Sequence, residues 1–257
     1  EHDPCIYALH DENGQLLVLI GLWVDDIFMT GPSTEHIKKI DDLLKKQFNT
    51  KNAGVLNQAV GIHFKWTSRG CQLLQTKHID LLLKKFGYEN ANPAPSPFPS
   101  NSKPSENMSP KNENDRKFMA NKNYRSLIGG LLYIAIASRP DIAYAVGALA
   151  RFSQDPGPGH WKLATHLLRY LAGTKESGLF FAFPKASDIP SDPMLALNAF
   201  HDASWANAPK SKSTGGFIIR FNGTPVNWKS KVLTKVALST TDAEIMEASV
   251  CARDVMW

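Results

Sequence analysis

The chain has 257 residues, of which 43% are hydrophobic and 21% are charged, and its net charge is +5. This length suits one large domain or two to three small ones, and the composition is typical of a soluble globular protein. The mild positive charge allows an anionic partner such as nucleic acid without requiring one.

The cysteines and the apolar runs exclude several classes of protein. The three cysteines are far apart and form no C-x-x-C pair, which argues against a zinc site or a disulfide framework and fits a reducing compartment. The longest apolar runs, 16–24 and 127–137, are shorter than the roughly 20 residues that a membrane span needs. No signal peptide is evident. We therefore expect no membrane partner.

The first 88 residues predict a β-rich segment with two amphipathic helices. Asn13-Gly14 between two apolar runs is a strong hairpin signal. Apolar residues recur at helical spacing after Ser33 and Thr34, which are the candidate N-caps. In chain order we expect strands at 5–13 and 15–24, a short strand at 27–29, a helix ending near Phe48, a hairpin across 59–75 and a helix ended by Gly87.

Residues 89–118 differ in composition from the segments on either side. They are rich in Pro, Ser and Asn and poor in aliphatic residues, so we expect a linker or a long connection that follows the surface.

The second half of the chain predicts helices and then a second β-rich segment. Pro140 is tolerated only in the first turn of a helix, so it separates two helical patterns. In chain order we expect helices at 124–138, from 139 onward and at about 160–171, strands at 178–183 and 195–200, a break at 184–193, a hairpin at 213–231 closed by Asn222-Gly223, and a helix at 239–257.

Two adjacent carboxylates, Asp25 and Asp26, interrupt the apolar stretch "LLVLIGLWVDDIFMTG". The pair is either a polar hairpin turn, or a metal site, or both. The apolar, β-prone flanks place the two acids at the edge of a buried sheet. Adjacent like charges are costly there unless a cation neutralises them, and hard divalent cations prefer carboxylate oxygens.

The ordered run of motifs resembles the Pol polyprotein of copia-type LTR retrotransposons, the pseudovirus family. "LWVDDIFMTG" is similar to the Tyr-x-Asp-Asp box of reverse transcriptases, with Trp23 in place of the usual Tyr. "AVGIHFKW", "YRSLIGGLLYIAIASRPDIAYAVGALARF" and "HWKLATHLLRYLAGTKESGL" are similar to later segments of the family, including its thumb and connection. "HDASWANAPKSKSTGG" and the sequence after it resemble the opening half of its ribonuclease H domain. The resemblance extends from about residue 3 to the end of the chain.

This resemblance implies an α+β fold made of parts of larger domains. Residues 1–88 are expected to form the C-terminal part of a reverse-transcriptase palm (a ferredoxin-like half) and the start of the thumb. Residues 89–118 are the expected linker, and 119–194 the helical thumb and connection. Residues 195–257 are expected to begin a ribonuclease H-like α/β domain.

The resemblance also implies two catalytic carboxylate sets. Asp25 and Asp26 belong to a polymerase site that binds Mg²⁺ or Mn²⁺, and Asp202 and Glu244 belong to a ribonuclease site for RNA in an RNA–DNA hybrid. The implied partners are an RNA template, a DNA primer and the hybrid. Family members work in cytoplasmic particles before nuclear integration.

Each carboxylate set lacks a further aspartate that the family needs. The missing palm aspartate belongs before Glu1 and the missing ribonuclease aspartate after Trp257, so we expect a fragment that is inactive alone. The alternatives are a non-catalytic nucleic-acid-binding remnant of a transposon and an inert product with no folded role.

Several of these acids also have purely structural interpretations. Thr241-x-x-Glu244 fits a capping box at a helix start. Asp202 suits a loop at the end of a strand. Glu247, one turn beyond Glu244, is expected to be a solvated helix residue, and Asp254 is a poor substitute for the missing ligand.

Basic and aromatic residues offer a nucleic-acid surface. Trp23 is expected near the primer end. Lysines cluster on the turns and strands of the last segment, and arginines recur in the helical middle. These charges serve solubility, or they line a groove that follows phosphates. The tryptophans near the end are expected mainly in packing roles, although each can stack on bases. The residues concerned are Lys210, Lys212, Lys229, Lys231, Arg139, Arg151, Arg169, Trp161, Trp205 and Trp228.

Overall fold

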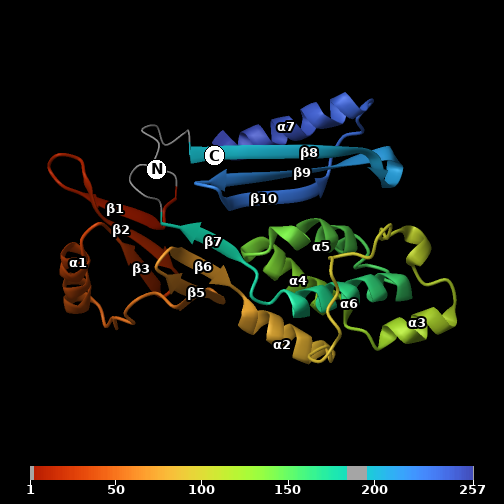
Figure 1. The fold of residues 1–257 in the computed structure, drawn as a ribbon, viewed down its shortest axis with the longest axis horizontal. Coiled ribbons are helices and arrows are strands. Elements are labelled where there is room, and N and C mark those ends of the chain that lie inside the picture. The colour runs from red at the N-terminus through yellow and green to blue at the C-terminus, as the bar shows by residue number, and fades with distance from the viewer. Residues whose placement is uncertain (1–2, 184–195, 257) are drawn as a thin grey trace. The chain divides into compact units, whose positions relative to one another are not determined.

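The computed structural model describes residues 3–183 and 196–256 (Figure 1). In this part of the chain seven α-helices accompany three antiparallel sheets, a mixture that agrees with the predicted α+β class. The chain divides into two compact units at residues 57/58, and each unit is described by itself. The expected break at 184–193 lies outside the described residues.

The first unit contains one three-stranded sheet and one helix. Asp11 accepts hydrogen bonds from the Asn13 and Gln15 amides at 2.9 and 2.8 Å, and Gly14 has a φ of +79°, so the predicted first hairpin is confirmed. Its elements are β1 (Ile6–His10), β2 (Leu16–Trp23), β3 (Asp26–Thr30) and α1 (Thr34–Gln47), with the sheet in the order β1-β2-β3.

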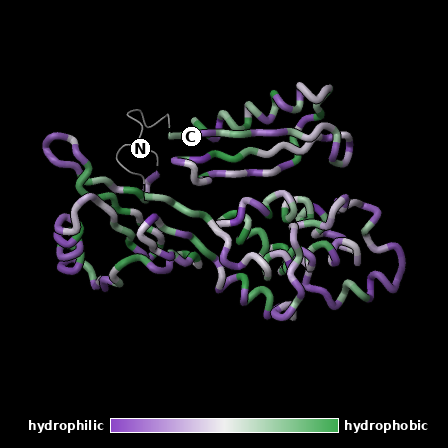
Figure 2. Tube along the Cα trace, in the orientation of Figure 1, coloured by the Kyte–Doolittle hydropathy of each residue, from purple (hydrophilic) through white to green (hydrophobic). Residues whose placement is uncertain are grey.

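The first unit has little apolar core of its own. Within its described residues Val18 is the one buried apolar side chain, at 0% exposure. Ser33 caps α1 by accepting the Glu35 amide at 3.2 Å, as predicted. The apolar stripe expected on α1 is nevertheless incompletely packed, because Leu43 and Phe48 are 55% and 63% exposed. Apolar colour also runs along β2 and β3 in Figure 2.

The second unit begins with a four-stranded sheet in the order β4-β5-β6-β7. The last strand joins from far along the chain, and Gly70 permits its close approach, because a Cβ there would lie 2.2 Å from the Phe181 carbonyl oxygen. The strands are β4 (Gln58–Ala59), β5 (Ile62–Thr67), β6 (Gly70–Leu74) and β7 (Leu179–Ala182).

Five helices pack around one apolar core in the second unit. Gly87 ends the first of them with a φ of +73°, as predicted. The core residues Leu127, Leu131 and Leu167 are 0% exposed. The helices are α2 (Thr76–Phe86), α3 (Glu113–Ala120), α4 (Tyr124–Ala137), α5 (Ala143–Ala150) and α6 (Pro158–Gly173), with a 3-10 turn, η2 (Pro140–Ile142), between α4 and α5.

The Pro/Ser/Asn-rich connection follows α6. Its main-chain carbonyls accept hydrogen bonds from α6 side chains: Ser96 pairs with His166 Nε2 at 3.0 Å and Asn92 with Arg169 Nε at 2.7 Å. The path therefore matches the expected surface-following connection. Residues 113–118, which we expected inside it, form the start of α3 instead.

The chain ends in a three-stranded sheet, in the order β10-β9-β8, with one helix on one face (Figure 1). Asn222 and Gly223, with φ of +47° and +79°, close the predicted hairpin as a type I′ turn requires. The expected strand at 195–200 continues well past Phe200, because its pairing with the next strand continues through Ser204. The elements are β8 (Leu197–Ala208), β9 (Lys212–Phe221), β10 (Thr224–Val232) and α7 (Thr240–Met256).

An ion pair with a buried guanidinium and a solvent-accessible carboxylate joins α4, η2 and the end of α6. Arg139 is 1% exposed; its Nε and Nη2 donate to the two carboxylate oxygens of Asp141 at 2.9 and 2.7 Å, and its Nη1 donates to the Thr174 carbonyl at 2.8 Å. The Tyr170 hydroxyl donates to the same carboxylate at 2.8 Å. Burial alone raises the pKa of Asp141, but the hydrogen bonds and charge of Arg139 outweigh it and hold this pKa below its usual value. Arg139 is therefore structural, and its expected place in a basic groove is wrong.

Replacing Arg139 with Met is expected to lower the free energy of unfolding by about 3 kcal/mol, because it removes the charged hydrogen bonds to Asp141 and to the Thr174 carbonyl. Urea unfolding of the purified chain measures this loss. Arg116→Met is the matched control, since its ion pair with Asp155 spans 3.9 Å between side chains that are about 60% exposed, and such pairs contribute roughly 0–1 kcal/mol. Equal losses in the two variants would contradict the structural role of Arg139.

His160 makes the anchoring of the connection sensitive to pH. It is 0% exposed; its Nδ1 accepts the Gly157 amide at 3.1 Å, so Nε2 carries the proton and donates to the Ser105 carbonyl at 2.9 Å. Burial lowers the pKa of His160. Below pH about 6.5 the unfolded chain therefore binds more protons than the folded chain. The contribution of His160 to the free energy of unfolding is therefore complete above that pH and is lost as the pH falls.

His160→Gln is expected to flatten the acid side of the pH–stability profile. Urea midpoints between pH about 5 and 8 give the measurement. Some slope remains in the variant, because burial also lowers the pKa of His78. An unchanged slope in His160→Gln would show that this histidine does not couple proton uptake to folding.

Candidate functional site

The two adjacent carboxylates lie at the tip of the β2–β3 hairpin. Trp23 pairs with Asp26 across the strands, so Val24 and Asp25 form a two-residue turn. Val24 has a φ of +54°, as the first turn position of a type II′ hairpin requires. A β-branched residue rarely adopts this conformation. The predicted turn is therefore confirmed at Asp25, while Asp26 is the first residue of β3. The backbone at the tip of the hairpin is strained.

The tip of this hairpin is open to solvent. Val24 is 90% exposed and Trp23 is 57% exposed, and Asp25 and Asp26 are both exposed. The prediction that the acids lie at the edge of a buried sheet is therefore wrong. Water screens their repulsion, so the turn is explained without a cation. Neither carboxylate makes a side-chain hydrogen bond to another described residue, and both are available to a ligand.

Asp202 and Glu244 come from β8 and from the first turns of α7. Glu244 Oε1 accepts the Ala203 amide at 3.1 Å, and Oε2 lies 3.8 Å from His201 Nδ1. Strand alternation directs the His201 and Ala203 side chains toward α7 and that of Asp202 toward the opposite face. The structure thus brings Glu244 to the peptide beside Asp202 without bringing their carboxylates together. Asp202 lies within the strand and not in a loop after it.

The capping arrangement of α7 differs from the expected one. Ser239 Oγ accepts the Asp242 amide at 3.1 Å, and the Asp242 carboxylate accepts the Leu238 amide at 2.8 Å. The predicted Thr241–Glu244 box is wrong, because Ser239 and Asp242 satisfy the helix start two residues earlier. This leaves the Glu244 side chain free to reach β8.

Glu247 is a buried acid, although we expected it in solvent. It is 4% exposed and packs against Gly215, where an added Cβ would lie 1.9 Å from its Oε2. Burial raises the pKa of Glu247, while the nearby charges of His201 and Lys229 oppose this shift. The signal missed in the sequence was the Gly215-Gly216 pair inside a strand pattern, which indicates a close approach.

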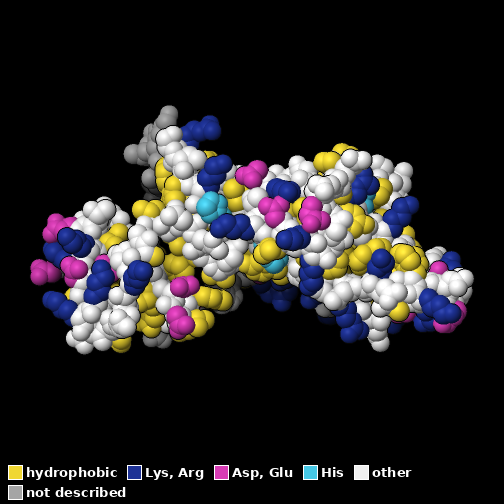
Figure 3. Space-filling view, turned by 90° about the horizontal axis from the view of Figure 1, so that it is seen from below, with side chains coloured by type: hydrophobic (Ala, Val, Ile, Leu, Met, Phe, Trp, Pro, Cys, Tyr) yellow, Lys and Arg dark blue, Asp and Glu magenta, His cyan; other side chains and the backbone are white. Residues whose placement is uncertain are grey.

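The lysines that we predicted to form a basic surface differ in their exposure and in their contacts. Lys229 Nζ lies 3.7 Å from Asp254 Oδ2 and 5.9 Å from the centroid of the Phe217 ring, on the α7 face of the sheet. Lys210 and Lys231 are exposed, whereas Lys212 is half-buried. On the face that Figure 3 shows, Lys and Arg side chains are dispersed among apolar and acidic ones.

The late tryptophans mainly pack or donate hydrogen bonds. The Trp228 indole donates to the Ala135 carbonyl at 2.8 Å, and that of Trp205 donates to Ala237 at 3.0 Å. Trp161 packs against the helical core. The contacts of Trp161 and Trp228 agree with the expected packing roles, whereas Trp205 is 48% exposed.

The described residues do not by themselves form a metal centre. No group of three or more His, Cys, Asp or Glu side chains in residues 3–183 and 196–256 is arranged to hold a metal ion. The exposed Asp25 and Asp26 offer two suitable oxygen donors, but a Mg²⁺ or Mn²⁺ site needs more ligands than this hairpin supplies. None of the helices in this part of the chain combines the length and apolarity of a membrane span.

Comparisons with known proteins identify the family. A reverse transcriptase (RNA-dependent DNA polymerase) family profile matches residues 1–100, which include the acidic hairpin. The retrovirus-related Pol polyprotein from transposon TNT 1-94 of Nicotiana tabacum is 35% identical over 99% of this chain and 19% of its own length. A transposon Ty5-1 protein of Saccharomyces cerevisiae is 30% identical over 93% of this chain and 74% of its own length. The chain belongs to the copia-type retrotransposon Pol family.

The relatives differ in how much of their length this Pol-family chain spans. It spans about a fifth of the tobacco polyprotein. A shorter relative from Plasmopara viticola, named secreted RxLR effector protein 161, is 38% identical over 54% of this chain and 93% of its own length. No solved structure matches the chain.

The two adjacent glycines of β9 provide a test of the buried acid in this Pol-family chain. Gly215→Ala is expected to destabilise the chain by about 1–3 kcal/mol, because the new methyl group overpacks against Glu247. Gly216→Ala is the matched control, since its nearest neighbour, the Lys229 carbonyl oxygen, is 3.3 Å from the added Cβ. The midpoint temperature of thermal unfolding measures the loss of stability in both variants. Adding Glu247→Ala to Gly215→Ala should recover part of the loss, and no recovery would contradict this packing.

Proposed function

We propose that this chain forms the Asp-Asp hairpin and the segments that follow it in a retrotransposon RNA-directed DNA polymerase. One observation carries the proposal: the β2–β3 turn presents Asp25, Asp26 and Trp23 to solvent within the region that the reverse transcriptase profile matches. In this proposal the first sheet is part of the palm, and α2–α6 form the thumb and connection.

The hairpin supplies charge and an aromatic surface to the reaction. Asp25 and Asp26 have no competing side-chain partner among the described residues, so both can accept a divalent cation. Mg²⁺ or Mn²⁺ would neutralise charge at the reacting phosphate. Trp23 offers an exposed ring against which the primer end can pack, without the phenol hydroxyl of the usual Tyr. Because the described residues supply no third ligand here, we propose that residues 1–257 alone do not extend a primer.

We further propose that β8–β10 and α7 begin a ribonuclease H-like domain that acts on RNA in an RNA–DNA hybrid. An antiparallel sheet with a helix on one face, and the anchoring of Glu244 at the Ala203 amide, support this assignment. Asp202 and Glu244 are its proposed catalytic acids. The Asp202 side chain leaves the face of β8 opposite the one that Glu244 of α7 approaches, so we propose that these two acids alone do not form a hydrolytic site.

A second candidate is nucleic-acid binding without catalysis. The absence of a metal-holding group from the described residues favours it. The exposed Lys210 and Lys231, together with Lys212, would contact phosphates, and affinity would fall as the salt concentration rises. Lys229 contributes less, because Asp254 neutralises it.

A chimeric polyprotein tests the catalytic proposal. Residues 1–257 replace the matching segment of the tobacco Pol polyprotein, and primer extension is measured on an RNA template with Mg²⁺ and with Mn²⁺. We expect extension that falls to background when Asp25 and Asp26 are both changed to Asn, because the site loses two anionic ligands. Residues 1–257 alone should give none.

Asp42→Asn is the matched control, since Asp42 is another exposed carboxylate of the first unit. It should leave extension unchanged, and a Trp23→Tyr chimera shows whether the indole limits the rate. Full extension by the double Asn variant would contradict the role of the hairpin. A chimera that binds primer-template but stays inactive, even with Tyr at position 23, would favour the second candidate.

A further inference from the structure

A carboxyl group lies inside the contact between α7 and the C-terminal sheet. Ala243, Glu247 and Cys251 follow one another at four-residue spacing and are 0%, 4% and 4% exposed, so they form the buried side of α7. Ala243 belongs to one small apolar cluster between helix and sheet, and Cys251 belongs to another. Glu247 therefore occupies the middle of the surface through which α7 packs, between the two clusters.

The backbone of β9 makes room for this side chain. Gly215 pairs with Ala203 of β8, and a Cβ added to Gly215 would point toward α7. The Oε2, Cδ and Cγ atoms of Glu247 lie 1.9, 2.4 and 2.9 Å from the position that such a Cβ would occupy. The carboxyl group thus rests directly on the main chain of the sheet, rather than at an edge from which it could turn into solvent.

Glu247 has no partner for its charge inside this contact. Among residues 3–183 and 196–256, no group forms a hydrogen bond or an ion pair with its carboxylate. Glu244, one turn earlier, instead accepts the Ala203 amide at 3.1 Å. A carboxylate that leaves water without gaining hydrogen bonds is the costly form of the group, whereas the neutral acid is tolerated much better.

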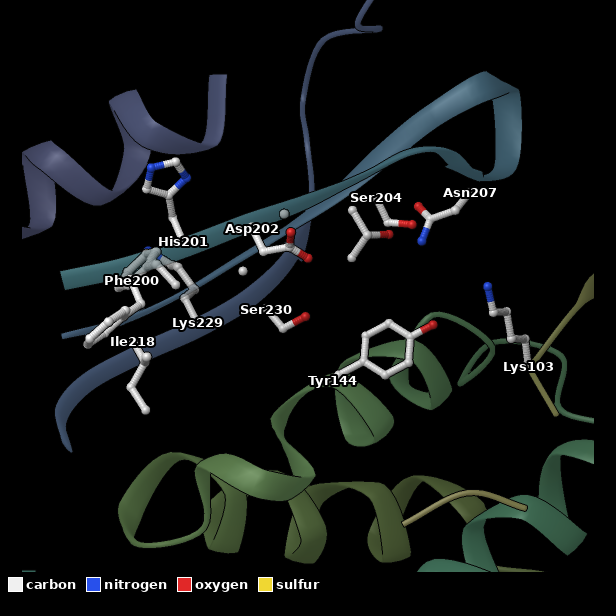
Figure 4. Close-up of a pocket in the computed structure, with 14 residues that line it drawn as sticks. Lys103, Tyr144, Phe200, His201, Asp202, Ser204, Asn207, Ile218, Lys229 and Ser230 are labelled. Carbon is white, nitrogen blue, oxygen red and sulfur yellow. The ribbon is translucent and has the colours of Figure 1, made fainter. Parts of the chain in front are cut away.

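The charges around Glu247 do not compensate for its burial. Glu244 and Asp254, on α7 itself, favour its neutral form, whereas His201 of β8 and Lys229 of β10 favour the charged form. Both cations are shared with other acids. Lys229 Nζ lies 3.7 Å from Asp254 Oδ2. His201, whose ring stands on the side of β8 that faces α7 (Figure 4), has its Nδ1 3.8 Å from Glu244 Oε2. Burial outweighs the two cations and raises the pKa of Glu247.

The remaining neighbours contribute little charge. On β9, Gly215 is followed on the same face by the apolar Phe217. Burial raises the pKa of the Cys251 thiol, so this group stays neutral. Lys231 is the β10 partner of Gly215, but its side chain is exposed, so water and salt screen its charge.

We propose that Glu247 is a proton-dependent latch between α7 and β9. With a proton, the neutral side chain completes the buried side of α7, and the helix packs firmly on the sheet. Without the proton, a buried and unpartnered charge weakens this packing. Because Glu244 on the same helix holds the Ala203 amide, the latch also controls how firmly that contact is kept. The latch goes beyond the proposed function and requires neither catalysis nor nucleic acid.

The raised pKa determines the direction of the pH dependence. In the unfolded chain a glutamate titrates at pH about 4.3. Between that pH and the raised pKa of the folded chain, the folded chain binds more protons than the unfolded chain. The contribution of the latch to the free energy of unfolding is therefore complete below the unfolded pKa and is lost as the pH rises through the folded pKa. The contribution of His160 has the opposite direction, since it is lost as the pH falls.

Urea midpoints of the full chain in EDTA, measured between pH about 4.5 and 8, test the latch. We expect the unchanged chain and Glu247→Gln to differ least at the acid end. The variant should become the more stable of the two as the pH rises, because Gln keeps the shape of the neutral acid and cannot ionise. Glu89→Gln, which changes an exposed glutamate of the same unit, is the matched control and should follow the unchanged chain. His160 and His78 are present in all three proteins, so their contributions cancel in the differences.

Hydrogen exchange measured by mass spectrometry reports α7 itself. After correction for the intrinsic pH dependence of exchange, peptides from α7 should lose protection as the pH rises, and peptides from α4 should not. Glu247→Gln should abolish the loss in α7. The arm on the unchanged chain needs no variant, so it decides the proposal even if Glu247→Gln does not fold. Protection of α7 that does not fall with rising pH, or a constant difference between the urea midpoints of the unchanged chain and Glu247→Gln, would overturn the latch. Failure of the chimera to extend a primer leaves these results unaffected, because they involve no nucleic acid.

Discussion

The buried guanidinium of Arg139 constrains the second unit more than any other single group. A permanently charged side chain with 1% exposure needs a hydrogen-bond acceptor for nearly every donor. Its acceptors come from η2, through Asp141, and from the end of α6, through Thr174. The helices that surround the apolar core are therefore fixed at their ends as well as along their sides. The sheet β8–β10 rests on the same region, since Trp228 donates to the last turn of α4.

This constraint gives the two faces of the C-terminal sheet different chemistry. Against α7, the sheet buries Glu247 and aligns Glu244 with the Ala203 amide. On the side toward α5, it leaves Asp202 at an open hollow. One strand, β8, thus directs alternate residues toward the packed α7 interface and toward the opposite face. The acidic hairpin of the first unit needs no such support, because its turn is determined by two strands and a few local bonds.

The features that the sequence predicts well are local ones. The turns at Asn13-Gly14 and Asn222-Gly223, the Ser33 cap and the Gly87 helix end depend on residues within a few positions of one another, so composition and spacing suffice. The roles of Arg139 and Glu247 could not be predicted in this way. Each is decided by a partner from another element, Thr174 in one case and Gly215 in the other.

The same distinction limits what could be predicted for the candidate site. The motif "WVDD" indicates a turn, a metal site or both, and the structure shows the turn. The face on which Asp202 lies follows from a strand that continues beyond its apolar part, and pairing with β9 rather than hydropathy sets that length.

The way in which α6 holds the connection has a consequence for sequence change. His160, His166 and Arg169 all bind carbonyl oxygens of the connection's main chain. Every amino acid offers that oxygen, so these three hydrogen bonds do not depend on which side chains the connection carries. Substitutions can therefore accumulate at its exposed positions while its route stays the same. The three α6 residues that hold it, and the Phe98 and Met108 side chains that pack against the helical core, are far less replaceable. A segment of low complexity can in this way keep a defined position, because the specificity belongs to the helix beneath it.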